Sequence, residues 1–351
     1  MKSKKRSMKI SGCIISLALV LMMAGVNQVN AQSGATTFGT SFSANEDWTH
    51  GAYFGSMGTF FADVDGDRRA DAIVVNADTV TVRRSNGSNF GPNEDWTRGP
   101  YFGSRGTFFA DVDGDGRADA IVVNNDTVVV RRAAADCFIV CWNFRFGPNE
   151  DWTNGPYFGN IGTFFADVTG DGRADAIVVN GTNITVRISS GSSFGPNVDF
   201  TVDPFIGDFT NFFFDMNADG KADAVALNMN NSNVRVRLSN GMGFDPPTTW
   251  LATGAFGFGF RSIGFGSVIK FGALAPLLLT VTNSRINVHR AVNAQGNLFP
   301  THPDRLGGVE DWTVVPYFGS RGTFFADVTG DGQIDAIVIN DDTVTVRRAV
   351  P

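Results

Sequence analysis

Residues 110–119 read ADVDGDGRAD and crowd four carboxylates into a short stretch: Asp111, Asp113, Asp115 and Asp119. Carboxylates this close repel one another unless a cation lies among them. Loops that wrap Ca²⁺ offer side-chain oxygens at positions 1, 3 and 5, a backbone carbonyl at position 7 and glycine at position 6. Counted from Asp111, position 6 is Gly116 and position 7 is Arg117, so the stretch predicts a calcium loop.

The loop differs from an EF-hand, which carries glutamate at position 12. Position 12 here is Val122, inside the apolar run AIVVN, so the last ligand is expected at position 9, Asp119. The loop then leads into a β-strand instead of a helix. A plain surface turn is the competing interpretation, because Asp-Gly is common turn chemistry. Repetition of the loop along the chain favours calcium.

Cognate loops begin at Asp63, Asp167, Asp215 and Asp327. The starts at 63 and 111, and those at 167 and 215, are 48 residues apart, and the gap from 215 to 327 leaves room for two units. A period of 40 to 50 residues with strand-like content is typical of propeller blades. The missing unit is a degenerate copy at 265–290, in which Phe271 and Ala275 replace two ligand aspartates. The chain therefore has six units and five metal loops.

Each unit predicts four short strands, with sequences such as GTFFADV, DAIVVN, VVVRR and NFGP. The segment AIVV is apolar throughout, as expected of a strand that neighbouring blades cover on both faces. The last unit lacks NFGP, and the N-terminal TSFSANEDW supplies it, because Phe42 lies 48 residues before Phe90. We predict an all-β, closed six-bladed β-propeller of four-stranded blades, in which an N-terminal strand completes the last blade and hides both edges.

The chain begins with a basic segment, MKSKKRSMKI, followed by a short apolar stretch at 14–24 and small residues before Gln32. This pattern predicts a signal peptide, residues 1–31, cleaved after Ala31, and a secreted, extracellular or periplasmic protein without a transmembrane anchor. We expect residues 32–351 to form a single propeller domain of six repeats, with the degenerate fifth repeat at about 245–300.

Loss of the five basic residues of that segment would take the formal net charge from −7 to −12. Such acidity argues against a nucleic acid as partner, because binding the phosphate backbone requires a basic surface. Two cysteines, Cys137 and Cys141, lie in an insertion of the second unit. Oxidising conditions favour a disulfide between them, which would require a tight turn at 138–140. Two free thiols are the alternative.

The repeated pattern YFGSxGTFFADVxGDGxADAIVV resembles the FG-GAP (VCBS-type) repeat family, the integrin-alpha-like propellers. The resemblance covers nearly all of the chain after residue 31. It implies up to five Ca²⁺ ions, held between the first two strands of the blades on one face of the ring. Such propellers occur in adhesion receptors, in sugar-binding lectins and as accessory modules of secreted enzymes.

We predict that positions 1, 3, 5, 7 and 9 of the five loops bind calcium. The residues are Asp63, Asp65, Asp67, Arg69 and Asp71; Asp111, Asp113, Asp115, Arg117 and Asp119; Asp167, Thr169, Asp171, Arg173 and Asp175; Asp215, Asn217, Asp219, Lys221 and Asp223; and Asp327, Thr329, Asp331, Gln333 and Asp335. Arginine and lysine would contribute only their backbone carbonyls. Arg68 replaces the position-6 glycine of the first loop, which is strained if that position needs positive φ.

Calcium affinity follows ligand charge and rigidity, so we expect the Asp111 loop to be the tightest and the Asp215 loop to be among the weakest. The calcium is expected to be structural. Catalysis has little support, since His50, His289 and His302 lie outside the repeated motif and no Ser/His/Asp triad or zinc spacing is present. A pair of carboxylates acting on a polysaccharide is the enzymatic alternative.

Aromatic residues recur at matching positions of the repeat and are candidates for stacking on sugar rings. They are Trp48, Trp96, Trp152, Trp312, Tyr53, Tyr101, Tyr157 and Tyr317. The competing interpretation is that they form the blade core. The apolar residues of the insertion, Phe138, Ile139, Val140 and Trp142, are a candidate contact for a partner protein or surface if they are exposed, and folding back over the ring is the alternative. The sequence thus favours a calcium-stabilised module that binds glycans or surface glycoconjugates, with a protein–protein adhesion or scaffold module, or an accessory or catalytic polysaccharide module, as alternatives.

Overall fold

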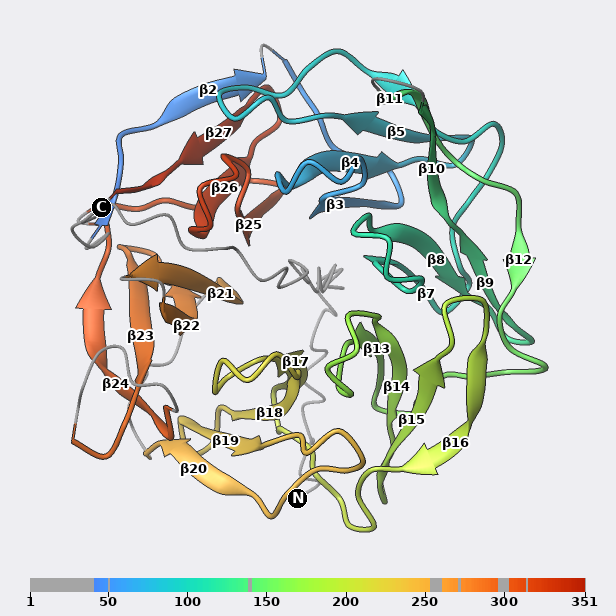
Figure 1. Cartoon of the computed structure of the whole chain (residues 1–351). Helices are drawn as coiled ribbons and strands as arrows, with labels where there is room; N and C mark the ends of the chain where they lie inside the picture. The colour runs from blue at the N-terminus through green and yellow to red at the C-terminus, as the bar shows by residue number, and fades with distance from the viewer. Residues whose placement is uncertain are drawn as a thin grey trace, which may run out of the picture.

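The computed structural model describes residues 41–49, 51–137, 141–252, 261–270, 273–295, 303–313 and 315–350. These residues are all-β and form six four-stranded antiparallel sheets and two two-stranded ones. The six larger sheets stand as blades around a central axis (Figure 1). The predicted six-bladed β-propeller is therefore confirmed. The predicted signal peptide lies outside the described residues, and within them no helix is long and apolar enough to cross a membrane.

We number the blades in the order of their first strands. Blade 1 contains β3 (Gly58–Ala62), β4 (Asp71–Val75), β5 (Val80–Arg83) and β6 (Glu94–Asp95). Blade 2 contains β7 (Gly106–Ala110), β8 (Asp119–Val123), β9 (Val128–Arg131) and β12 (Glu150–Asp151). Blade 3 contains β13 (Gly162–Ala166), β14 (Asp175–Val179), β15 (Ile184–Ser189) and β16 (Phe194–Asp199).

The other three blades follow the same plan. Blade 4 contains β17 (Thr210–Phe214), β18 (Asp223–Asn228), β19 (Asn233–Arg237) and β20 (Thr248–Leu251). Blade 5 contains β21 (Ser262–Lys270), β22 (Ala273–Val281), β23 (Ile286–Val292) and β24 (Arg305–Asp311). Blade 6 contains β25 (Gly322–Ala326), β26 (Asp335–Ile339), β27 (Val344–Arg347) and, from the N-terminal part of the chain, β2 (Glu46–Thr49).

The hydrophobic core lies between neighbouring blades. The second strand β8 is buried along its whole length, which fits the uninterrupted apolar sequence AIVV. One core cluster joins Ile73 and Val75 of blade 1 to Phe109 and Ala120 of blade 2. Phenylalanine rings of adjacent first strands also meet, as in Phe60 and Phe109, whose centroids are 5.0 Å apart. Each blade therefore buries its apolar faces only by packing on its neighbours.

In blade 3 the outermost strand begins at Phe194 and includes the predicted FGP segment, but in blade 1 the outermost strand lies further along the repeat than the sequence analysis predicted. In blade 1 it is Glu94–Asp95 instead of NFGP, and Phe90 makes only an isolated bridge with Ser85. That bridge closes a tight turn, and Pro92 just beyond it has no N–H to donate to a ladder. Regular pairing therefore resumes at Glu94, opposite Val82.

The N-terminal strand β2 pairs antiparallel with β27, with Glu46 opposite Val346 and Asp47 opposite Thr345. The two-residue strands β1 (Ser41–Phe42) and β28 (Ala349–Val350) also pair. Both pairings are what the predicted closure of the ring requires. It stays a prediction that these two pairings close the ring and hold it together.

Blade 5, the predicted degenerate unit, has lost its metal loop. Strands β21 and β22 stay paired as far as Lys270 and Ala273, which leaves only residues 271 and 272 between them. Phe271 lies outside the described residues. Ala275 lies within β22, opposite Val268, and is buried.

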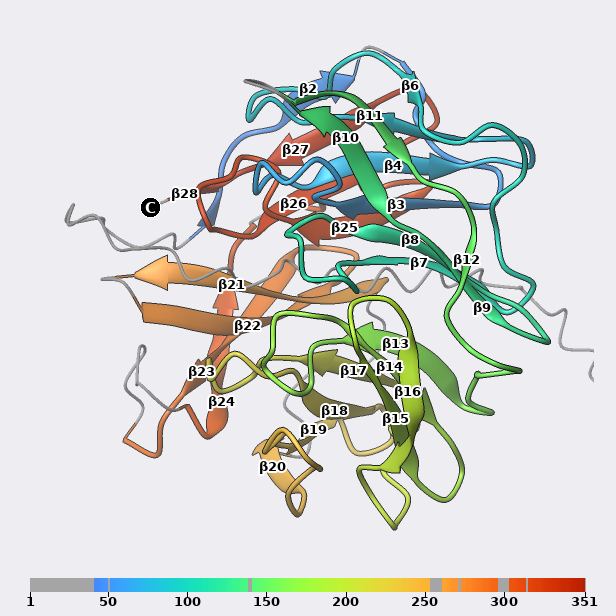
Figure 2. The ribbon, with the colours of Figure 1, turned by 45° about the vertical axis from the view of Figure 1, so that its right-hand side comes forward.

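The insertion of blade 2 forms a hairpin of β10 (Ala133–Cys137) and β11 (Cys141–Phe146), and β10 crosses in front of β3 and β4 of blade 1 in Figure 2. Cys137 and Cys141 are joined by a disulfide, with their Cα atoms 4.1 Å apart, so the disulfide prediction is confirmed. The predicted turn at 138–140 lies outside the described residues. Phe144 of the hairpin stacks on Trp96 of blade 1, and Trp142 is half exposed.

Candidate metal centres

The five acidic loops, residues 63–71, 111–119, 167–175, 215–223 and 327–335, join the first strand of a blade to the second. Neighbouring loops contact each other directly. The backbone N–H of Ala118 donates to the carbonyl of Asp63 in the preceding blade at 2.7 Å, and Ala174 donates in the same way to Asp111. The loops therefore lie side by side along one face of the ring.

The first aspartate of each loop organises the loop backbone. The two carboxylate oxygens of Asp111 accept the N–H groups of Gly114 and Gly116 at 2.7 and 2.8 Å. The position-6 N–H donates to the position-1 carboxylate in all five loops. Gly116 has φ of 86°, a conformation that suits glycine. Arg68 occupies the same position of the first loop with φ of 71°, which confirms the expected positive φ.

The ninth residue of each loop is a fully buried aspartate. Asp119 is 0% exposed, and its carboxylate accepts the N–H groups of Val112 at 3.1 Å and Ala133 at 2.8 Å. The same two backbone bonds recur in the other four loops, at Asp71, Asp175, Asp223 and Asp335. Position 9 therefore ties the loop to the end of the third strand, a structural role that the sequence analysis missed.

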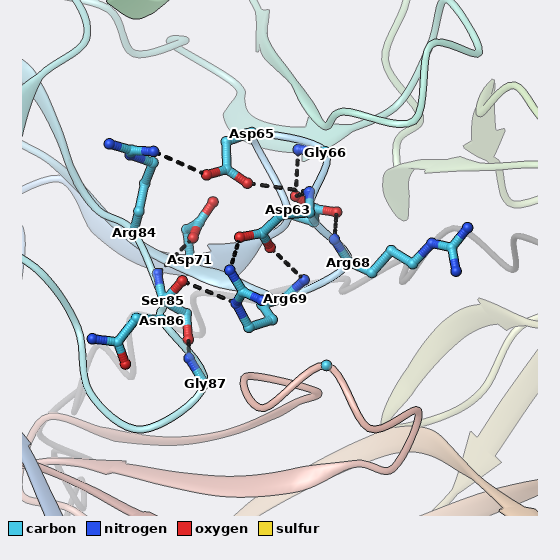
Figure 3. A network of polar contacts seen from close by, with 12 residues as sticks. Asp63, Asp65, Gly66, Arg68, Arg69, Asp71, Arg84, Ser85, Asn86 and Gly87 are labelled. Carbon is cyan, nitrogen blue, oxygen red and sulfur yellow. Dashed lines mark hydrogen bonds and ion pairs between the residues drawn. The ribbon is translucent and has the colours of Figure 1, made fainter. Parts of the chain in front are cut away.

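Carboxylates converge most closely in blades 1 and 2. Within the described residues, oxygen atoms of Asp63, Asp65 and Asp71 all lie within 4.8 Å of one another. The same holds for Asp111, Asp113 and Asp115. Figure 3 shows the loop of blade 1, with Asp63, Asp65 and Asp71 gathered beside Arg84 and Arg69.

Burial makes these carboxylates costly to ionise without a cation. It raises the pKa of Asp63 and of Asp111 to about 6, with repulsion from neighbouring aspartates adding to the effect. Burial raises the pKa of Asp175 to about 7 and that of Asp335 to about 8. For Asp119, burial and the nearby charge of Asp113 place the pKa well above its usual range.

Hard oxygen donors at this density fit Ca²⁺, which takes six to eight oxygen ligands and neutralises the clustered charge. A softer metal would need histidine or cysteine, and the acidic loops contain neither. Which carboxylate and carbonyl oxygens of the twenty-five candidate residues bind the ion stays a prediction.

Arginines beside the loops supply part of the counter-charge, and the sequence analysis did not identify them. Arg84 lies 3.3 Å from Asp65 and 2.9 Å from Glu94. Arg132 lies at the equivalent place in blade 2, 3.6 Å from Asp113 and 3.0 Å from Glu150. The repeated Arg-Arg pair at the end of the third strand was the signal that could have found them.

The aromatic residues expected to stack on a ligand are buried, which corrects that expectation. The four tryptophans, Trp48, Trp96, Trp152 and Trp312, are 1–2% exposed, and the four tyrosines, Tyr53, Tyr101, Tyr157 and Tyr317, are 4% exposed. The Tyr101 hydroxyl donates to backbone carbonyls of Ala120 and Val129 within its blade. A sugar ring has no open aromatic face at these positions, so the alternative interpretation, blade core, describes them.

His289 is the one candidate histidine among the described residues, because His50 and His302 lie outside them. Its side chain is 3% exposed, and its Nδ1 atom lies 2.9 Å from the carbonyl of Gly307. Burial lowers the pKa of His289. The residue is thus part of the packing of blade 5.

Comparison with known proteins begins with one family model. Residues 63–122, which hold the first two acidic loops and the strands between them, match the model described as FG-GAP-like repeat. No curated protein sequence is similar enough to this chain to count as a relative.

Solved structures provide further comparisons. A chain of the Photorhabdus luminescens Tc holotoxin pore has a TM-score of 0.62 and 14% identity over 90% of this chain and 15% of its own length, and it shows the fold alone. An Agrocybe aegerita lectin that recognises non-reducing terminal N-acetylglucosamine has a TM-score of 0.49 and 22% identity. That match covers 73% of this chain and 65% of the lectin chain. The match to an FG-GAP-like repeat at residues 63–122 and the six four-stranded blades together support an FG-GAP repeat β-propeller.

Proposed function

We propose that the protein is a secreted propeller that up to five Ca²⁺ ions stabilise and that binds glycans or surface glycoconjugates. The observation that carries the calcium part is the convergence of carboxylates in the acidic loops, with oxygens of Asp111, Asp113 and Asp115 within 4.8 Å of one another. Ca²⁺ would supply positive charge there and hold each loop in one conformation. Side-chain oxygens at positions 1, 3, 5 and 9 and the carbonyl at position 7 would hold the ion.

The loops differ in the charge that they offer to calcium. Thr169 and Thr329 bring no carboxylate to position 3, and Asn217 brings none to the Asp215 loop. The Asp111 loop keeps all four aspartates and both glycines. We therefore infer that it binds calcium most tightly and that the Asp215 loop is among the weakest.

A repeated polar surface supports glycan binding better than the buried aromatic residues do. In blade 1, the Arg83 guanidinium lies 4.4 Å over the Tyr53 ring, and its Nε donates to the exposed amide of Asn93 at 2.5 Å. Equivalent arginine–tyrosine–asparagine groups recur in three other blades, centred on Arg131, Arg187 and Arg347. Fixed donors and acceptors at four matching places suit the hydroxyls of a ligand with repeating units and would act together by multivalency.

A glycan array with and without calcium tests this proposal. We expect binding of the purified protein in calcium and weaker binding after chelation, because the loops lie at the ends of the strands that carry Arg83 and its equivalents. Substitution of Arg83, Arg131, Arg187 and Arg347 together by methionine should abolish the signal, while the same change at the exposed Arg98 is the control. The glycan assignment would be contradicted if the protein bound no glycan in calcium, or if the four substitutions left glycan binding unchanged.

Secretion has its own test. Sequencing of the N-terminus of protein recovered from a secreting host should begin at Gln32 if residues 1–31 are a cleaved signal peptide. Retention of the complete chain inside the cell would contradict this part of the proposal.

A protein–protein adhesion module is the second candidate, because an apolar side chain is exposed directly before the first strands of blades 1, 3 and 4, and Phe102 is exposed four residues before that of blade 2. Met57 is 49% exposed, Phe102 37%, Ile161 50% and Phe209 39%. Exposed apolar groups on a shared face are typical of protein contacts. Aspartate substitution at Met57 and Ile161 should abolish cell adhesion but leave glycan binding intact if this candidate is correct.

A further inference from the structure

Four acidic loops have a long basic side chain at position 7. A residue that binds calcium only through its backbone carbonyl does not need such a side chain. These residues are Arg69, Arg117, Arg173 and Lys221. Each forms an ion pair with the position-5 aspartate of its own loop. Lys221 lies 3.0 Å from Asp219, and the three arginines pair in the same way with Asp67, Asp115 and Asp171. The position-5 carboxylate thus already has a cation beside it.

The arginines are also held to their own blade. The Nε atom of Arg69 donates to the carbonyl of Ser85 at 3.0 Å, and Arg173 donates to Ser189 at 3.2 Å. The equivalent bond of Arg117, to Ala133, is 3.4 Å long. These carbonyls belong to the residues whose N–H groups bind the position-9 aspartates. The side chain is therefore placed by two separate contacts within its blade.

The aliphatic stem of the same side chain lies across the acidic loop of the preceding blade. A Cβ atom built on Gly66 would lie 3.1 Å from Cγ of Arg117, and one on Gly114 would lie 2.9 Å from Cγ of Arg173. Gly170 meets Lys221 in the same way, at 2.9 Å, and Gly330 meets Arg69, at 2.8 Å. The position-4 glycine leaves the space through which the neighbouring side chain passes.

The two junctions that involve blade 5 act as a natural control. Blade 5 has no acidic loop, so no basic residue follows the loop of blade 4, and position 4 of that loop is Ala218 instead of glycine. Blade 6 follows blade 5, so its loop has no preceding loop to cross, and its position 7 is Gln333. The basic side chain and the glycine are thus both present where two loops adjoin and both lost where one is missing.

We propose that the basic residue at position 7 clips neighbouring blades together and competes with calcium for the position-5 carboxylate. The calcium affinity of a loop is then linked to the contact that its position-7 side chain makes with the preceding blade. Without calcium, the ion pair fixes the side chain across the junction. With calcium, the position-5 carboxylate turns to the metal, and the basic group becomes a nearby positive charge that weakens metal binding. The competition rests on the calcium binding proposed above, whereas the clip does not.

Arg117→Gln in the full chain tests both parts, because glutamine is the natural residue at this position of the blade 6 loop. In excess EDTA, we expect the melting temperature to fall, since the contact of the Arg117 side chain with the blade 1 loop at Gly66 is lost, whereas the partly exposed ion pair with Asp115 contributes little. In calorimetric titration with calcium alone, we expect one site to bind about three-fold more tightly, the effect of removing one partly exposed competing ion pair. The two effects have opposite signs.

Gln333→Arg is the matched control. Its loop has no preceding acidic loop, so the new arginine has nothing to clip, and the melting temperature in EDTA should stay within error of the unmodified protein. Calcium binding at that one site should weaken about three-fold, because the arginine can pair with Asp331.

Several outcomes would overturn the proposal. An unchanged melting temperature of the Arg117→Gln variant in EDTA would refute the clip, and weaker or equal calcium binding would refute the competition. If the unmodified protein takes up no calcium, the proposed function fails and the competition fails with it. The clip is still decided in that case by the EDTA melting curves alone.

Discussion

Blades 2 and 5 form the same four-stranded sheet in different ways. In blade 2, the five-residue strands β7 and β8 are joined by the acidic loop that begins at Asp111. In blade 5, the nine-residue strands β21 and β22 continue as a plain hairpin to Lys270 and Ala273. Their second strands are equally buried, with Leu277, Leu278 and Leu279 at 0% exposure in blade 5.

The difference separates what the fold requires from what the acidic loop adds. Extended backbone pairing is enough to join the first two strands, because blade 5 does so without a single loop carboxylate. Holding the carboxylates of Asp111, Asp113 and Asp115 within 4.8 Å of one another costs free energy that strand pairing does not offset, since like charges this close repel without a cation. The comparison supports metal binding as the reason that five loops keep their acids.

The largest expected effect is that of calcium removal. Each occupied site stabilises the folded state by about 2.7 kcal/mol when free calcium is one hundred times the dissociation constant, so several sites together should shift the melting temperature by more than about 10 °C. Differential scanning calorimetry in calcium and in excess EDTA measures the shift. Hydrogen exchange should show that chelation loosens β7 and β8 far more than β21 and β22. Identical melting curves in calcium and in EDTA would contradict stabilisation by a metal.

Asp119→Ala should destabilise the protein by about 2–4 kcal/mol, measured by urea unfolding. The substitution leaves the buried N–H groups of Val112 and Ala133 without their acceptor, and this loss does not depend on metal. The destabilisation should therefore persist in EDTA. Asp113→Asn is the matched control, because it removes a carboxylate and its ion pair with the partly exposed Arg132 but no backbone bond, so its effect should be small in EDTA and larger in calcium. Equal behaviour of the two variants in EDTA would contradict the structural role of position 9.

The metal-free protein should become less stable as the pH rises. Burial raises the folded-state pKa of Asp111 to about 6, of Asp175 to about 7 and of Asp335 to about 8, from a usual value of 3.8. A raised carboxyl pKa adds stability below the unfolded value, and that stability is lost as the pH passes the folded value. The free energy of unfolding, measured with urea in EDTA, should therefore fall from about pH 4 to about pH 8. Saturating calcium should reduce this dependence on pH. A rise in stability with pH in EDTA would show the opposite linkage.

The smallest expected effect is that of Arg68→Gly in the loop of blade 1. Arg68 is exposed and has φ of 71°, whereas the equivalent Gly116 of blade 2 has φ of 86°. Relief of the left-handed strain should stabilise the protein by about 1 kcal/mol in chemical unfolding. Gly116→Arg should cost a similar amount in blade 2. If neither substitution changes stability, backbone strain does not distinguish the two loops.

The repeat period and the uninterrupted apolar run AIVV were enough to predict the propeller, because both follow from local pattern and from the need of each sheet for neighbours. The positions of the acidic loops were equally visible. The outermost strand of blade 1 was misplaced, since NFGP and NEDW both have strand-like composition and only the tight turn at Ser85–Phe90 decides where pairing resumes.

The roles of the aromatic and basic side chains depend on contacts between repeats, which composition does not reveal. Trp96 and Tyr101 have the same sequence pattern whether their rings face a ligand or the core, and only packing with the next blade decides the matter. Arg117 was considered for its carbonyl alone, because its contact with Gly66 joins residues of different blades. Spacing within one unit could not predict a contact between two.

The pairing of β2 with β27 also affects how the chain can be made. Thr49 and Val344, which share a backbone-to-hydroxyl bond in this sheet, are 295 residues apart in sequence. At a synthesis rate of roughly 5–20 residues per second, β2 emerges about 15–60 s before its partner exists. Blade 6 is therefore the last to be completed, and until then β2 offers an open edge to which the β27 strand of another copy can add.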